Sequence, residues 1–174
     1  MYKSGHTGLS LLFYSPLLYL FIEFNELALA SIGLIIIISY SSVPDLDFKV
    51  PGVKHRGYSH SLIGAVIIAL PMSIIAYFSY IYLNKLTVEF GGELAYSPML
   101  MSVFAFILAF FAVLTHYAGD IVTPSGIPIL APVSKKKYSL NLFYAKNKLA
   151  NGLSLFLGIS ATLTVVGMHI YSAF

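Results

Sequence analysis

Long apolar runs separated by short polar segments make up most of this chain. The apolar runs cover residues 8–22, 27–40, 62–83, 99–115 and 150–171. About 20 apolar residues in a helix cross the hydrocarbon core of a membrane. The first two runs are short for a span, and Pro16 should kink the first. The pattern predicts an all-α, polytopic membrane protein with about five transmembrane helices. A four-span arrangement that merges or drops the first two runs also fits.

Composition supports this fold class. The chain has 174 residues, of which 58% are hydrophobic and 10% charged, with a mean hydropathy of +0.84. Soluble globular domains carry about a quarter charged residues. No linker, repeat or low-complexity stretch divides the sequence, so we expect a single membrane-embedded domain over residues 1–174. The absence of cysteine excludes disulfides, thiolate catalysis and cysteine-zinc sites.

Basic residues are distributed unevenly between the two predicted sides of the membrane. Nine of the ten lie in the N-terminus, the segment 43–61 and the region from 121 to the fifth run: Lys3, Lys49, Lys54, Arg56, Lys135, Lys136, Lys137, Lys146 and Lys148. Cytoplasmic loops carry an excess of Lys and Arg. We therefore expect a multi-pass protein of the cell (inner) membrane, with its N-terminus cytoplasmic and its C-terminus outside.

A secretory signal peptide is a competing interpretation of the first apolar run. Lys3 precedes that run, and Ala28-Leu29-Ala30 has the small residues of a cleavage site. An acidic turn at 23–26 separates the apolar core from this site, which is not typical of signal peptides. We therefore expect His6 to remain in the functional protein.

The segment 43–61 is the densest polar stretch of the chain. It holds two carboxylates, two imidazoles and a guanidinium, on Asp45, Asp47, His55, Arg56 and His60. Carboxylate oxygens and imidazole nitrogens are ligands of zinc and similar divalent cations. Prolines and glycines within the segment exclude one continuous helix, so the chain can fold back and bring these groups together.

A second group of polar residues follows the fourth apolar run. His116 and Asp120 are four positions apart, so they share one face of a helix that continues this run. Together with His6 they fall on the same predicted side as the segment 43–61. We predict that His60, His116, Asp120 and the Asp45/Asp47 pair form one metal site at the cytoplasmic face. His55 is expected beside the ligands or near the substrate.

Several of these motifs together resemble a known family. P-D-L-D at 44–47, H-R-G-Y-S-H-S at 55–61, H-Y-A-G-D at 116–120 and T-P-S-G at 123–126 are similar to the YdjM-like family of membrane-bound metal-dependent hydrolases. The resemblance extends over nearly the whole chain. It implies metal-dependent hydrolysis without naming a substrate.

The order of candidate ligands also resembles zinc-dependent phospholipase C and P1-type nucleases. By position, that similarity implies that Asp45 or Asp47 holds one metal together with His60 and His116. Asp120 would bridge to a second metal bound by His6. The chain lacks the later His and His-x-x-x-Glu of a third zinc site. We therefore expect one or two divalent ions, zinc before others.

The function expected from these residues is hydrolysis of a phosphate ester by metal-activated water. Whichever of Asp45 and Asp47 is not a ligand would act as general base or orient a histidine. Arg56 would bind the substrate anion, or else anchor a lipid head group. Lys135–Lys137 are expected to contact anionic membrane lipid. Ser59, Ser61 and Thr123 are interpreted as helix caps rather than nucleophiles.

The site's position at the membrane surface favours a lipid or a lipid-linked phosphate ester as substrate, and no nucleic-acid partner is expected. The alternative is a metal-binding membrane protein without catalysis, either a divalent-cation transporter or a scaffold. Transporters place their ligands near the middle of the bilayer. No carboxylate or histidine of this chain lies in the middle of a predicted span, which argues against transport.

Overall fold

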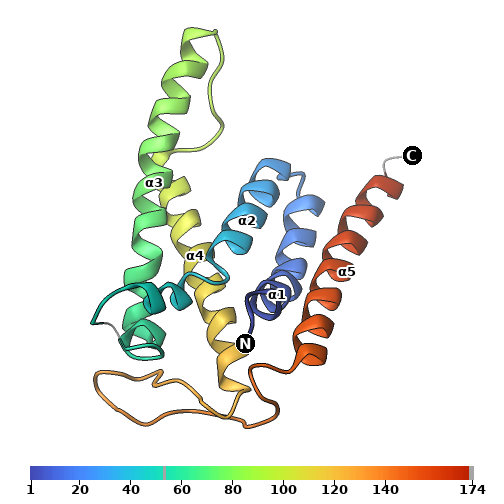
Figure 1. The fold of residues 1–174 in the computed structure, drawn as a ribbon. Helices are drawn as coiled ribbons and strands as arrows, with labels where there is room; N and C mark the ends of the chain where they lie inside the picture. The colour runs from blue at the N-terminus through green and yellow to red at the C-terminus, as the bar shows by residue number, and fades with distance from the viewer. Residues whose placement is uncertain (53, 173–174) are drawn as a thin grey trace.

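The structure, a computed structural model, describes residues 1–52 and 54–172 and is built from helices (Figure 1). The helices are α1 (Lys3–Glu23), α2 (Leu27–Tyr40), α3 (Leu62–Glu89), α4 (Pro98–Ile121) and α5 (Lys148–Ser172). Two short 3₁₀ helices, η1 (Pro44–Lys49) and η2 (Tyr58–His60), lie between α2 and α3. Over the described residues, five helical segments are long and apolar enough to cross a membrane, which confirms the prediction of five spans.

Two helices extend beyond the apolar runs that predicted them. α1 begins at Lys3, so His6 lies in the first turns of the helix and not in a polar head before it. α3 continues through Asn84 and Lys85 to Glu89, and the connection to α4 is correspondingly shorter than expected. Polar residues at a helix end do not stop a helix, and α3 ends just before the Gly91–Gly92 pair.

The helices pack as two long pairs joined by a shorter helix. α1 runs along α5, α3 runs along α4, and α2 contacts both α1 and α4. The α1–α5 contact depends on small residues. A Cβ atom added to Gly158 would lie 2.1 Å from the carbonyl oxygen of Gly8, so the two backbones touch there. Small residues of this kind allow transmembrane helices to approach closely.

The polar connections gather at one end of this bundle. In Figure 1 the N-terminus, η1, η2 and the long loop 122–147 lie together, and the C-terminus lies at the opposite end. The loop is attached to the helices by backbone hydrogen bonds. Leu62 N donates to Ile129 O at the start of α3, and Leu140 N donates to Ile121 O at the end of α4. This end of the bundle holds all the candidate ligands.

Candidate metal centre

Four of the predicted ligands converge at this end of the bundle: Asp45 of η1, His60 of η2, and His116 and Asp120 of α4. The α4 pair lies on one helical face, as the spacing predicted, and η1 and η2 bring the other two groups to it. The side chains of His60, His116 and Asp120 have no solvent exposure, and that of Asp45 is 25% exposed. The group is therefore buried and reaches solvent on the Asp45 side.

The four ligand atoms lie within 4.8 Å of one another, and five of the six distances among them are close to those of a tetrahedral site. The Nε2 atoms of His60 and His116 are 3.3 Å apart. Asp120 Oδ2 lies 3.3 Å from the first of them and 3.6 Å from the second. Asp45 Oδ1 lies 3.7 Å and 3.5 Å from the same two nitrogens. Tetrahedral ligands bound at about 2.0–2.2 Å are about 3.3–3.6 Å apart, so the four groups could hold one metal ion.

Hydrogen bonds fix the orientation of both imidazoles. His116 Nδ1 lies 2.9 Å from the carbonyl oxygen of Ser41 and must donate to it, because a carbonyl only accepts. In the neutral ring, Nε2 then carries the lone pair and faces the other ligand atoms. His60 Nδ1 lies 3.0 Å from Ser59 Oγ, and that hydroxyl donates its own proton to Asp47 Oδ2. Nδ1 of the second ring therefore donates as well, and its Nε2 also faces the other ligand atoms. Partners of this kind are typical of metal-bound histidines.

The pKa of His60 reflects this environment. Burial by itself lowers the pKa, but the carboxylates of Asp120 and Asp45 hold a proton on the ring and raise the pKa above its usual value. A divalent cation bound between the same carboxylates would displace that proton, because only the neutral ring is a ligand.

Asp47 lies on the other side of His60, and Asp47, His55 and His60 form a second group whose ligand atoms lie within 4.8 Å of one another. Its Oδ1 is 2.8 Å from His55 Nδ1. Its Oδ2 accepts hydrogen bonds from Ser59 Oγ at 2.6 Å and from the backbone N–H of Arg56 at 3.2 Å. Both carboxylate oxygens are thus engaged by protein donors.

His6 is completely buried and reaches the centre from α1. Its ring stacks on that of His116 with centroids 3.7 Å apart. Its Nε2 lies 3.6 Å from Asp120 Oδ1 and 3.9 Å from Asp45 Oδ2, the oxygens that face away from the tetrahedral group. Gly119 permits this approach, since a Cβ atom there would lie 2.9 Å from His6 Nδ1.

Some buried polar atoms of the centre have no hydrogen-bond partner among the described residues. They are both ring nitrogens of His6, Oδ2 of Asp120 and Nε of Arg56, whose guanidinium contacts Asp120. Buried polar atoms are nearly always paired in native proteins. Because Asp120 Oδ2 is one corner of the tetrahedral group, this observation fits a cation as its partner.

The guanidinium of Arg56 lies against the opposite oxygen of Asp120. Arg56 NH2 donates to Asp120 Oδ1 at 2.5 Å, and NH1 donates to Thr123 Oγ1 at 3.1 Å. The amino group of Met1 also donates to Asp120 Oδ1, at 2.9 Å. Arg56 has a positive φ of 55°, a conformation that is uncommon outside glycine and often found at functional sites.

These residues lie within the motifs that suggested a family, and the comparison with protein families agrees. The family model described as YdjM inner membrane protein matches residues 1–173. The chain belongs to the YdjM inner membrane protein family. A search of curated proteins and of solved structures finds no match. Family membership and the five apolar helices together establish a multi-pass membrane protein. The similarity to phospholipase C and P1-type nucleases stays a prediction.

Within this YdjM family member, sequence reasoning missed residues that support the ligands. The hydroxyl of Tyr117 donates to the carbonyl oxygens of Ser59 and Ser61, and its ring stacks on His60. Ser61 caps α3 as predicted, because its Oγ accepts from Gly64 N at 3.1 Å. Ser59 instead holds Asp47. The signal for Tyr117 was its place inside the H-Y-A-G-D motif. No sequence pattern could have indicated the Ser41 carbonyl, which accepts from His116, because every residue has such a backbone group.

Proposed function

We propose that this protein is a membrane-embedded, metal-dependent hydrolase that cleaves a phosphate ester of a lipid or lipid-linked substrate. The observation that carries the proposal is the tetrahedral group of Asp45, His60, His116 and Asp120 at one end of a transmembrane bundle. Two imidazoles and two carboxylates in this arrangement suit zinc better than magnesium or calcium, which prefer six or more oxygen ligands.

The four ligands differ in their access to solvent, and this difference suggests their roles. His60, His116 and Asp120 are fully buried and would hold the ion. When bound there, a divalent cation polarises a phosphate ester and makes a water molecule acidic enough to react near neutral pH. Asp45 is the partly exposed member of the group, so water and substrate would reach the ion from its side. We assign to Asp45 the acceptance of a proton from the attacking water.

Asp47 and His55 support this centre from outside it. Asp47 orients His60 through Ser59, whose hydroxyl donates to Asp47 and lies 3.0 Å from His60 Nδ1. His55 in turn binds Asp47. Metal-bound histidines commonly rely on such carboxylates, whose loss reduces metal affinity. His55 is 27% exposed and stacks on Phe48, so its side chain closes the solvent side of Asp47.

We favour one ion over two. A second ion between His6, Asp45 and Asp120 would need Asp120 Oδ1 as a ligand. That oxygen already accepts hydrogen bonds from the cationic groups of Arg56 and Met1, and a carboxylate oxygen has two lone-pair sites. We expect His6 to pack against His116 and face both carboxylates. Elemental analysis of the purified protein should find one zinc per chain, and two would contradict this assignment.

A scaffold that binds metal without catalysis is the second candidate. Four protein ligands around one ion are typical of structural zinc sites. The experiment that separates the candidates is an activity screen with phosphomonoester and phosphodiester lipids on zinc-loaded protein. The enzyme hypothesis predicts turnover that is lost in Asp45→Ala, which keeps the three buried ligands. Zinc retention without turnover of either ester class would favour the scaffold.

We also propose that the metal centre faces the cytoplasm. Nine of the ten basic residues lie in the N-terminus and in or beside the connections at the same end of the bundle as the centre, and cytoplasmic segments carry an excess of Lys and Arg. Because the chain has no cysteine, labelling of a single introduced cysteine reports on which side of the membrane that position lies. Lys54→Cys should react with a membrane-impermeant maleimide only from the cytoplasmic side, and Glu89→Cys only from the outer side. Labelling of both from one side would refute this topology.

A further inference from the structure

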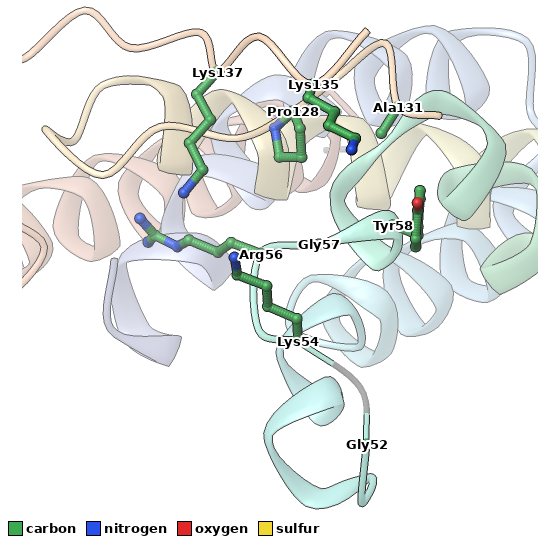
Figure 2. Close-up of a pocket in the computed structure, with 9 residues that line it drawn as sticks. All are labelled: Gly52, Lys54, Arg56, Gly57, Tyr58, Pro128, Ala131, Lys135 and Lys137. Atoms are coloured by element: carbon green, nitrogen blue, oxygen red, sulfur yellow. The ribbon is translucent and has the colours of Figure 1, made fainter. Parts of the chain in front are cut away.

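A basic cavity of about 590 Å³ lies beside the metal centre (Figure 2). Four cationic side chains line it: Lys54, Arg56, Lys135 and Lys137. Figure 2 shows Lys54 and Lys137 reaching toward Arg56 from opposite walls, one formed by the segment before η2 and the other by the loop 122–147. No carboxylate is among the described residues that line the cavity. The charge of this cavity therefore suits an anion.

An apolar cavity of about 430 Å³ lies next to the basic one. Its walls include Ile63, Ile67 and Ile68 at the start of α3. The two cavities share Tyr58 as a lining residue, and the neighbours Ala131 and Pro132 line one cavity each. Because α3 is a membrane-spanning helix, the apolar cavity runs from the polar end of the bundle toward the level of the lipid chains.

We propose that the two cavities together bind one amphiphilic ligand, a lipid whose phosphate-bearing head group occupies the basic cavity and whose chain lies along α3. This inference rests on the proposed function and specifies where the head group and the chain of its lipid substrate bind. A free phosphate would use only the four cationic groups. The adjoining apolar cavity matches a chain attached to the head group, and the exposed ring of Tyr58, polar at one end and apolar at the other, stands where the two parts would meet.

Arg56 connects the basic cavity to the metal ligands. Its side chain lines the cavity, and its guanidinium touches Asp120 Oδ1 at 2.5 Å. Two further hydrogen bonds hold Arg56 there. Its NH1 donates to Thr123 Oγ1, and its backbone N–H donates to Asp47 Oδ2. A guanidinium has five donors, so Arg56 can keep these contacts and still donate to a phosphate. A head group in the basic cavity would thus lie beside the metal centre.

Binding of dioleoyl phosphatidic acid to the detergent-solubilised full chain tests this proposal. Native mass spectrometry measures the bound fraction after metal has been removed with a chelator, so that no turnover interferes. The unmodified protein should bind phosphatidic acid at least about tenfold more tightly than phosphatidylcholine or the water-soluble glycerol 3-phosphate. Equal affinity for glycerol 3-phosphate and phosphatidic acid would overturn the proposal, because the apolar cavity would then contribute nothing.

Matched variants separate the two cavities. Lys137→Glu should weaken phosphatidic acid binding about tenfold, whereas Lys136→Glu, whose side chain lies over the Tyr138 ring outside the basic cavity, should change it little. Ile67→Trp should weaken binding several-fold by filling the apolar cavity. Ile74→Trp, two turns further along the same face of α3, is its control. All four positions are exposed, so the fold should tolerate the changes, which circular dichroism verifies.

The binding result and the activity result are independent. Selective lipid binding without turnover on zinc-loaded protein would reject the proposed hydrolase and leave the lipid site standing. Turnover of some phosphate ester with no selective binding of phosphatidic acid would reject the lipid site alone. Equal losses in Lys137→Glu and Lys136→Glu would also reject it, because the effect would then come from general surface charge.

Discussion

Replacing Asp120 with asparagine changes the chemistry of one corner of the candidate metal centre while keeping its shape. In the native protein, Asp120 Oδ2 lies 3.3 Å from His60 Nε2 and is one corner of the tetrahedral group. Asparagine can keep an oxygen at Oδ1 to accept from Arg56 and places an NH₂ group at the other corner. An amide NH₂ donates hydrogen bonds and does not bind a cation. Asp120→Ala would instead leave the Arg56 guanidinium without its acceptor, which costs more stability.

The size of the effect follows from the loss of one of the three buried ligands, the only one of them that is a carboxylate. Removing a residue that merely supports a metal ligand already lowers affinity about 10- to 100-fold, so removing the ligand itself should cost at least about 100-fold. With free zinc held at about 100 times the native Kd, bound zinc stabilises the native protein by about 2.7 kcal/mol. That zinc concentration would be close to the Kd of the variant, so bound zinc would stabilise the variant by only about 0.4 kcal/mol.

Thermal unfolding in detergent micelles measures this difference. The chain has no tryptophan, so far-ultraviolet circular dichroism of the helices is the suitable signal. Zinc should raise the unfolding temperature of the native protein and of His169→Gln, whose histidine lies near the C-terminal end of α5. Zinc should raise that of Asp120→Asn much less. If Asp120→Asn kept the full zinc-dependent stabilisation, the four-residue group would not be the metal site.

Other predictions address the surroundings of the centre. Asp47→Asn should lower zinc affinity about 10- to 100-fold, because Asp47 orients His60 through the Ser59 hydroxyl; unchanged affinity in calorimetry would contradict this role. The raised pKa of His60 stabilises the metal-free protein fully below the unfolded value near pH 6.5, and this contribution is lost as pH rises through the folded pKa. Zinc affinity should increase over that same interval, and parallel unfolding profiles with and without zinc would refute the linkage. Gly158→Val should lower the unfolding temperature because its side chain meets the α1 backbone, whereas Gly167→Val has open space and should not; equal effects would mean that the α1–α5 contact is not tight.

The spans and the gathering of the ligands could be predicted because simple physical rules govern them. Apolar length defines a membrane helix, and alternation of the spans puts the N-terminus and the second and fourth connections at one end. The four-residue spacing of His116 and Asp120 needs only helix geometry. The start of α1 at Lys3 could not be read from hydropathy, because the residue before it is held by a tertiary contact: Tyr2 N donates to Asn151 Oδ1 of α5.

The sequence also could not predict that Asp45 and Asp47 contact different groups of side chains. The segment was expected to be a folded-back loop, and in a loop either carboxylate can face the histidines. In η1 the two residues lie two positions apart, and a 3₁₀ helix has three residues per turn. Their side chains therefore leave the helix axis in directions about 120° apart. Asp45 reaches the tetrahedral group, and Asp47 reaches His55 and the far nitrogen of His60.

The pattern of paired and unpaired atoms at this end of the bundle argues for a cation there. Ionisable groups in a membrane protein are costly, and they persist where partners or function offset the cost. Asp47 has protein donors on both oxygens, and Asp120 Oδ1 has Arg56. Asp120 Oδ2 has none among the described residues, and it faces two imidazoles whose Nε2 atoms are 3.3 Å apart. If both rings were neutral, their lone pairs would face one another and a carboxylate oxygen. A positive charge between them turns this repulsion into attraction: a proton on His60 supplies it in the metal-free protein, and a divalent cation would take its place.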